Sequence, residues 1–187
     1  MKDHLHRFQY NEQERKKRQD PFKILKDIGL KSGMVFIDIG SNEGFFTIPA
    51  TQIVGSKGHV YALDIDDVAI AKLSQKIDKL NIKNCLAMTA NAEEFCFDQG
   101  IADILFLGTV LHDFKNPLKV LKNAKSMLKN NGTLINLDWQ KKDMIIGPPP
   151  NIRFSTLKAQ KLIEKAGLRV VSIEDYDQFY YLIKASK

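Results

Sequence analysis

Two short segments of the sequence combine glycine with acidic side chains at a spacing that suits a nucleoside ligand. The segment DIGSNEG at residues 38–44 overlaps the end of the apolar run Met34–Ile39, and Asp64 closes a second apolar run. Glycine lets the chain turn sharply and lets a ligand approach the backbone, and the helix expected next presents free N–H groups. An acid at the end of the next strand can accept hydrogen bonds from ribose hydroxyls. The two segments therefore predict a nucleoside site.

The glycine loop distinguishes between two ligands. A dinucleotide fingerprint, G-x-G-x-x-G, requires glycine at positions 42 and 45 when it starts at Gly40. The sequence has Asn42 and Phe45 there, so a nicotinamide dinucleotide is disfavoured. S-adenosylmethionine has no phosphate, and its amino-acid end carries an ammonium, which Asp38 can help neutralise, and a carboxylate, which loop N–H groups can receive. A tight turn without any ligand stays the alternative.

A third loop, Ala90-Asn91-Ala92-Glu93, follows another apolar run. The Asn91 amide can donate and accept hydrogen bonds together, which suits the edge of an adenine. The same side chain also suits an Asx turn or a helix cap. The residues leave both interpretations open.

Four later side chains are candidates for the acceptor side of a site. His112 can take a proton from an acceptor, or it can hydrogen-bond its own loop. Asp138 is a candidate base or anchor, and Trp139, the only tryptophan, can stack on a flat substrate or cover the core. Arg153 follows the stiff run Pro148–Pro150 and can bind an anionic acceptor, unless this segment is a simple linker.

Alternating elements are expected to bring these residues to one edge of a sheet. The expected strands cover residues 34–39, 60–64, 85–89, 104–107, 134–137, 168–173 and 179–184. The expected helices cover residues 21–28, 45–53, 67–80, 117–128 and 156–166, and Asn130-Asn131-Gly132 is expected to close the fourth of them. Strands that alternate with helices favour a parallel sheet covered on both faces. Residues 174–178 are too few for a parallel crossover, so the last two strands must be antiparallel to each other.

Composition sets the wider limits. The 187 residues suffice for one domain, which we expect at residues 21–187 after an N-terminal arm, residues 1–20, that can fold over the site as a lid. No apolar run is long enough for a membrane span, and the start lacks a signal-peptide core, so a cytoplasmic protein without a membrane partner is expected. Cys85 and Cys96 have no metal or redox spacing, and no metal site is expected.

The net charge of +6 is unevenly distributed along the sequence. Nine basic residues and five acidic ones fall within the first 33 positions. Such an arm can attract nucleic acid. A solvated helix face is the favoured interpretation, because no aromatic residues alternate with the basic run.

The order of the motifs resembles a known family. DIGSNEG, YALDID, TANAEE and the long segment from ADILFLG to LINLDW resemble the class I S-adenosylmethionine-dependent methyltransferases, most closely the small ubiquinone-biosynthesis-type branch. The resemblance covers about residues 21–187. It implies an α/β, Rossmann-like methyltransferase fold, a three-layer sandwich with a seven-stranded, mostly parallel sheet whose last strand is antiparallel.

The resemblance also implies roles for individual residues. The residues implied to line the methionine end of the cofactor are Asp38, Gly40, Ser41, Asn42 and Gly44. Asp64 would take the ribose hydroxyls, and the residues implied at the adenine are Ile65, Asn91 and Ala92. Thr109 and Leu111 would lie beneath the cofactor. The sequence departs from the family pattern twice, because Asn42 replaces the usual middle glycine and Asn91 replaces the usual acid of the third loop.

We therefore expect an enzyme that transfers a methyl group from S-adenosylmethionine to a small-molecule acceptor by in-line displacement. A dedicated base is needed only where the acceptor must lose a proton. One alternative is an RNA methyltransferase that uses the basic N-terminal arm. Another is a non-catalytic nucleoside-binding or scaffold protein on the same fold, since one fold hosts many functions.

Overall fold

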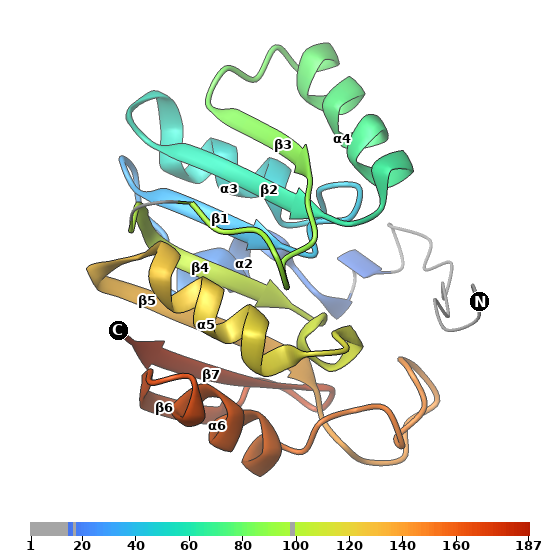
Figure 1. Ribbon diagram of the computed structural model, residues 1–187. Helices are drawn as coiled ribbons and strands as arrows, with labels where there is room; N and C mark the ends of the chain where they lie inside the picture. Colours follow the sequence, from blue (N-terminus) through green and yellow to red (C-terminus); the bar gives the residue numbers. More distant parts are fainter. Residues whose placement is uncertain (1–14, 17, 98–99) are drawn as a thin grey trace.

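The computed structural model describes residues 15–16, 18–97 and 100–187, which form one seven-stranded sheet with helices on both faces (Figure 1). The strands are β1 (Val35–Ile39), β2 (His59–Asp64), β3 (Cys85–Thr89), β4 (Ala102–Gly108), β5 (Leu128–Trp139), β6 (Arg169–Asp175) and β7 (Tyr180–Ser186). Their order across the sheet is β3-β2-β1-β4-β5-β7-β6. Strand β7 runs antiparallel to both of its neighbours, and the other pairs are parallel. The predicted fold class is confirmed.

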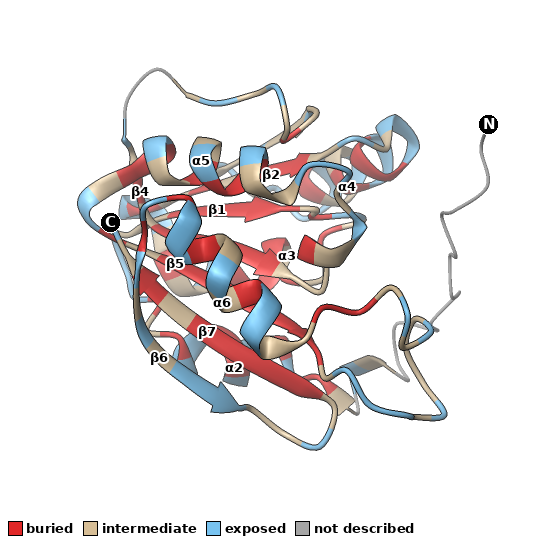
Figure 2. Cartoon of the chain, turned by 60° about the horizontal axis from the view of Figure 1, so that its bottom comes forward, coloured by how far each residue is buried: buried red, intermediate tan, exposed pale blue. Residues whose placement is uncertain are grey.

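The helices divide between the two faces of the sheet. They are α2 (Pro21–Asp27), α3 (Thr47–Val54), α4 (Asp67–Lys79), α5 (Pro117–Met127) and α6 (Thr156–Lys165). Apolar residues of α2, α3 and α4 pack on one face, and those of α5 and α6 pack on the other. Figure 2 shows buried residues on the strands and on the inner sides of the helices, as in a three-layer sandwich.

Local signals place several helix ends where the sequence predicts them. The Asp20 side chain caps α2 by accepting hydrogen bonds from the backbone N–H groups of Phe22 and Lys23. Gly167, with φ of +84°, follows α6 and supplies the left-handed conformation that ends many helices.

The predicted turn before the fifth strand is wrong, and this strand, expected at residues 134–137, is β5 (Leu128–Trp139). Asn130-Asn131-Gly132 was expected to close the helix before the fifth strand, but α5 passes directly into β5 at Leu128. The pairing of β5 with β4 shifts between Ala102 and Ile104, so this segment forms an irregular start of the strand. The physical reason is close packing, because a Cβ at Gly132 would lie 2.7 Å from the Ala102 carbonyl oxygen.

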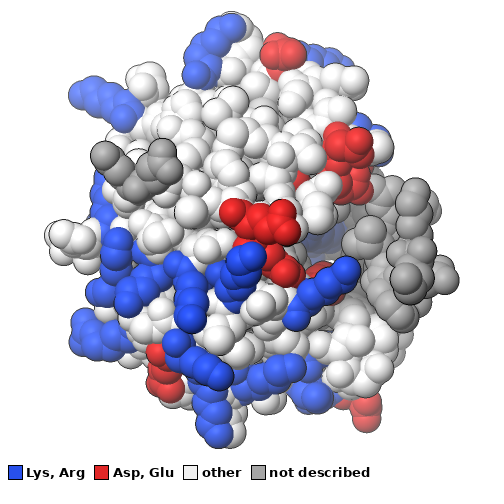
Figure 3. All heavy atoms as spheres, in the orientation of Figure 1, with Lys and Arg blue, Asp and Glu red and all other residues white. Residues whose placement is uncertain are grey.

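Basic side chains gather over α5 and α6, as Figure 3 shows. The exposed lysines of these helices are Lys119, Lys122, Lys158, Lys161 and Lys165. Counting charges along the sequence pointed instead to the N-terminal arm, whose residues 1–14 lie outside the described part of the chain. The expectations that the arm binds nucleic acid or closes as a lid therefore remain predictions.

Candidate functional site

The glycine loop lies at the carboxyl end of β1, where ligands bind in open α/β sheets. The backbone N–H groups of Gly40 and Ser41 donate to the Leu63 carbonyl oxygen of β2, at 2.8 and 3.1 Å. Gly40 has φ of +74°, and a Cβ there would lie 2.6 Å from a methyl carbon of Val110. Glycine is therefore required at this turn for both its conformation and its size.

Asn42 adopts the conformation that glycine would supply. Its φ is +49°, in the left-handed region that asparagine tolerates better than most residues. Its side-chain Oδ1 accepts a hydrogen bond of 2.7 Å from the N–H of Glu43, which stabilises the turn. Asn42 can therefore replace the glycine of the family pattern without a change in the backbone conformation of the loop.

Asp64 joins the glycine loop to the turn after β2. Its carboxylate accepts hydrogen bonds from the N–H groups of Asn42, at 2.7 Å, and Asp66, at 2.9 Å. Each carboxylate oxygen has two lone pairs, so one acceptor position on each remains beyond these two bonds. The carboxylate orders the loop and keeps capacity for hydroxyl donors.

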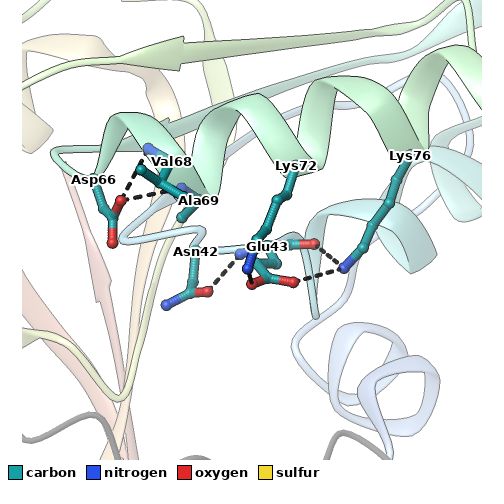
Figure 4. Close-up of polar contacts among 7 residues, drawn as sticks. All are labelled: Asn42, Glu43, Asp66, Val68, Ala69, Lys72 and Lys76. Carbon is teal, nitrogen blue, oxygen red and sulfur yellow. Dashed lines mark hydrogen bonds and ion pairs between the residues drawn. The ribbon is translucent and has the colours of Figure 1, made fainter.

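Helix α4 supports the same loop from outside, as Figure 4 shows. The Glu43 carboxylate pairs with the ammonium groups of Lys72, at 2.8 Å, and Lys76, at 3.3 Å, and the hydrogen bond from Lys72 is the main cause of its lowered pKa. Asp66 caps α4 by accepting from the N–H groups of Val68 and Ala69. The loop is thereby attached to a rigid element.

Asp38 is a buried carboxylate beneath the loop. Burial raises its pKa to about 7, and the nearby Asp64 charge adds to the rise. The Thr47 hydroxyl, which donates to Oδ2 at 2.7 Å, and the Arg15 charge both oppose it. A cation bound beside Asp38 would favour its ionised form.

The loop after β3 is an Asx turn, which is one of the two interpretations left open. The Asn91 Oδ1 accepts from the N–H of Glu93 at 3.0 Å, while its amide NH₂ still offers donors to a ligand. Ala92 is buried beside it, and Ile65 exposes 67% of its surface at the end of β2. The role of these three residues at an adenine stays a prediction.

Thr109 and Leu111 follow β4 at the same edge. Thr109 has φ of +59°, which is a strained conformation for a β-branched residue, and its N–H donates to the Leu137 carbonyl oxygen at 2.7 Å. Leu111 is completely buried. Strain of this kind is concentrated at functional sites, which is consistent with a ligand over this turn.

His112 and Asp138 form a buried pair between the turn after β4 and the end of β5. The His112 Nδ1 lies 2.8 Å from the Asp138 Oδ1, and their side chains are 3% and 1% exposed. The His112 Nε2 lies 3.4 Å from a carboxylate oxygen of Asp113. Burial lowers the pKa of His112, but Asp138 and Asp113 outweigh it, so the pKa is raised. The arrangement favours an imidazolium held between two carboxylates.

Trp139 and Arg153 are both engaged in packing. The Trp139 ring is buried against Tyr180, with the ring centres 4.5 Å apart. The Arg153 guanidinium donates hydrogen bonds to four carbonyl oxygens, those of Gln140, Lys142, Ile146 and Pro148. Arg153 thereby fastens the loop that precedes it, and the roles predicted for Arg153 with an anionic acceptor and for Trp139 in stacking on a substrate stay predictions.

Arg15 also lies at this edge, although no motif singled it out. Its guanidinium carbon is 3.9 Å from the centre of the Phe45 ring, and its charge lowers the pKa of Asp38. No regular spacing relates Arg15 to the glycine loop, so only its surplus charge within a basic stretch could have drawn attention to it.

Within 15–16, 18–97 and 100–187, no group of three or more His, Cys, Asp or Glu side chains is placed to hold a metal ion. In the same part of the chain, no helix has both the length and the apolar character to cross a membrane.

The chain is similar to known methyltransferases. The sequence profile of a family described as "Methyltransferase domain" matches residues 30–178. The crystal structure of a SAM-dependent methyltransferase from Aquifex aeolicus is 30% identical, covers 91% of each chain and has a TM-score of 0.87.

Curated relatives match over a shorter length. The ubiquinone/menaquinone biosynthesis C-methyltransferase UbiE of Vibrio vulnificus (strain YJ016) is 32% identical over 117 residues, which are 60% of this chain and 44% of that protein. The demethylmenaquinone methyltransferase of Bacillus mycoides (strain KBAB4) is 26% identical over 123 residues, 66% of this chain and 52% of that protein. The matched segment therefore spans about half the length of these relatives.

Proposed function

The chain belongs to the methyltransferase-domain family, among its S-adenosylmethionine-dependent members, and from that premise we propose that it methylates a small organic acceptor. S-adenosylmethionine is the cofactor of these enzymes. The proposal rests on one observation above all, the hydrogen bond of 2.7 Å that joins the Asn42 N–H to the Asp64 carboxylate. This hydrogen bond connects the glycine loop, which is expected at the methionine end of the cofactor, to Asp64, which is expected at its ribose.

The residues present fit this cofactor. The Ser41 hydroxyl is buried and has no hydrogen-bond partner among the described residues, so it is available to a polar ligand. Asp64 has acceptor capacity for the ribose hydroxyls, and Asp38 offers a carboxyl group that a bound ammonium would keep ionised. The exposed Ile65 side chain supplies an apolar surface for a base.

The cofactor supplies a methyl group on a positively charged sulfur, and the protein must hold an acceptor in line with it. Orientation and exclusion of water account for much of such catalysis. The glycine loop and Asp64 would hold the cofactor, while the ends of β4 and β5 would shape the site of the acceptor. We propose that His112 and Asp138 orient the turn after β4, because both ring nitrogens of His112 face carboxylates and its side chain is 3% exposed. The prediction that His112 or Asp138 acts as a base is the less favoured alternative.

The acceptor class follows from the relatives and from the site. The matched relatives carry the names of C-methyltransferases and methyltransferases of quinone biosynthesis, so we propose a small molecule methylated at carbon. The RNA methyltransferase is the rival, and the lysines over α5 and α6 are the observation in its favour. RNA binding that weakens steeply with salt and methyl transfer to RNA would favour the rival.

Calorimetric titration with S-adenosylmethionine, S-adenosylhomocysteine and NAD tests the proposal. We expect both adenosyl compounds to bind and NAD not to bind. Asp64→Ala should weaken binding of S-adenosylhomocysteine by about 1–3 kcal/mol, because charge-assisted hydrogen bonds are lost. Asp67→Ala, at an exposed acid in the first turn of α4, is the matched control and should leave affinity unchanged. Failure of the wild type to bind either adenosyl compound would favour the scaffold alternative.

A further inference from the structure

Arg15 lies near the carboxyl end of β1 and is held there by polar and aromatic contacts. Its Nε donates to the Gln19 Oε1 at 2.8 Å, and Gln19 is itself 2% exposed. The guanidinium lies over the Phe45 ring, with its carbon 3.9 Å from the ring centre, and 5.5 Å from the centre of Phe46. Phe45 and Phe46 directly follow the glycine loop. The contacts with an amide and an aromatic face restrict the rotamers of the Arg15 side chain and orient its guanidinium.

Opposite charges therefore flank the glycine loop. Asp38 lies buried under it, and the Arg15 charge is near enough to lower the pKa of Asp38. The amino-acid end of the proposed cofactor is a zwitterion, with an ammonium and a carboxylate on the same carbon. A ligand of this kind needs a cation and an anion at neighbouring positions, and this edge of the sheet provides both.

We propose that Arg15 binds the carboxylate of the cofactor's methionine moiety while Asp38 faces the ammonium. This proposal rests on the proposed function and extends it to a residue outside the recognised motifs. A guanidinium matches a carboxylate with two parallel N–H donors, which a point charge cannot do. It also offsets the repulsion that the ligand's carboxylate would meet from Asp38 and Asp64.

The assignment adds Arg15, which precedes α2, to the binding site. It also predicts selectivity, because a nucleoside that lacks the amino-acid end gains nothing from Arg15. 5′-Methylthioadenosine is such a ligand, since it has the same nucleoside and sulfur but no ammonium or carboxylate. Comparison of this compound with S-adenosylhomocysteine therefore isolates the contribution of Arg15.

The test is calorimetric titration of both compounds into wild-type protein and variants. Arg15→Gln should weaken the binding of S-adenosylhomocysteine about 10- to 100-fold, as expected for the loss of a charge-assisted bidentate pair. The same substitution should change the affinity for 5′-methylthioadenosine by less than about twofold. Arg15→Lys keeps the charge but loses the planar fork, so the loss should be about three- to tenfold. Lys16→Gln removes the same charge from the neighbouring exposed position and should leave both affinities unchanged.

Each contrary outcome has a defined meaning. Unchanged binding of S-adenosylhomocysteine by Arg15→Gln overturns the proposal. An equal loss for both compounds also overturns it, because Arg15 would then only shape the loop. Thermal melting will show whether Arg15→Gln has a folding defect. If it has one, Arg15→Lys provides the test, through its loss of affinity for S-adenosylhomocysteine relative to its loss for 5′-methylthioadenosine. Wild-type protein that binds neither compound contradicts the proposed function and this inference together, whereas wild-type binding with an insensitive Arg15 variant contradicts the inference alone.

Discussion

At the ends of β1 and β2 the candidate site is formed mainly by backbone, whereas at the ends of β4 and β5 it is formed by buried charged side chains. The first region contains three positive φ angles, at Gly40, Asn42 and Gly44, and its N–H groups donate to the Leu63 carbonyl oxygen and the Asp64 carboxylate. The second contains the His112–Asp138 pair and the loop fastened by Arg153. Main-chain N–H groups and turns can bind a ligand through backbone geometry, whereas the acceptor side depends on which side chains are present.

The largest effect is expected from the backbone region. Gly40→Ala should lower the free energy of unfolding by about 3–4 kcal/mol, because it combines a positive φ with a contact of 2.6 Å to Val110. Gly29→Ala is a matched control, since Gly29 has φ of +92° and nothing within 4 Å of the added carbon. The control should lose only about 1 kcal/mol in urea unfolding. Equal losses would mean that close packing at Gly40 is unimportant.

The second prediction concerns the charged side chains. Asp138→Asn should lower stability by about 2–3 kcal/mol at pH 6, because it weakens a buried charge-assisted hydrogen bond. The pKa of His112 is raised above 6.5, so the stabilisation is complete below pH 6.5 and is lost as pH rises through the folded value. The difference between wild type and variant should therefore shrink at pH 9.

Chemical denaturation across this pH range measures the effect. Asp113, Asp138 and Arg153 all influence the pKa of His112, so His112→Asn is the control that identifies the titrating group. A difference between wild type and Asp138→Asn that does not depend on pH would contradict the ionic description of this region.

The third prediction concerns Asp38, which is expected to lower the stability of the free protein while it contributes to cofactor binding. Burial raises the pKa of Asp38 from 3.8 to about 7, so the contribution of Asp38 to stability should fall as pH rises from about 4 to 7. Asp38→Asn should remove this decline and stabilise the free protein by about 1–2 kcal/mol at pH 8. The same substitution should weaken the binding of S-adenosylhomocysteine at least tenfold. A variant that is stabilised yet binds normally would exclude Asp38 from the cofactor site.

The smallest effect is expected at Asn42, which stands where the family pattern has glycine. Asn42→Gly should change stability by less than about 0.5 kcal/mol and the affinity for S-adenosylhomocysteine by less than about threefold, because both residues adopt positive φ. Asn42→Val is the contrasting variant, and it should lose more than about 1 kcal/mol since a β-branched residue is strained there. Similar behaviour of the two variants in urea unfolding would show that the conformation of residue 42 is not the determinant.

The sequence by itself determined the alternation of strands and helices, the antiparallel last strand and the glycine loop with Asp64. These depend on local patterns: apolar runs of strand length, a link too short for a crossover, and residues that tolerate sharp turns. Asn42 was identified as a departure, but only its φ of +49° shows why it is compatible with the loop. The irregular start of β5 was missed because a bulge depends on the neighbouring strand.

Only the tertiary structure decided the roles of charged side chains far apart in the sequence. The sequence does not show that Arg153 contacts four carbonyl oxygens, because the fold brings them to it. The contact of His112 with Asp138 and the position of Arg15 over Phe45 likewise join residues that are far apart in the sequence. The physical reason is range: backbone conformation is set by neighbours in sequence, whereas the environment of a charge is set by neighbours in space.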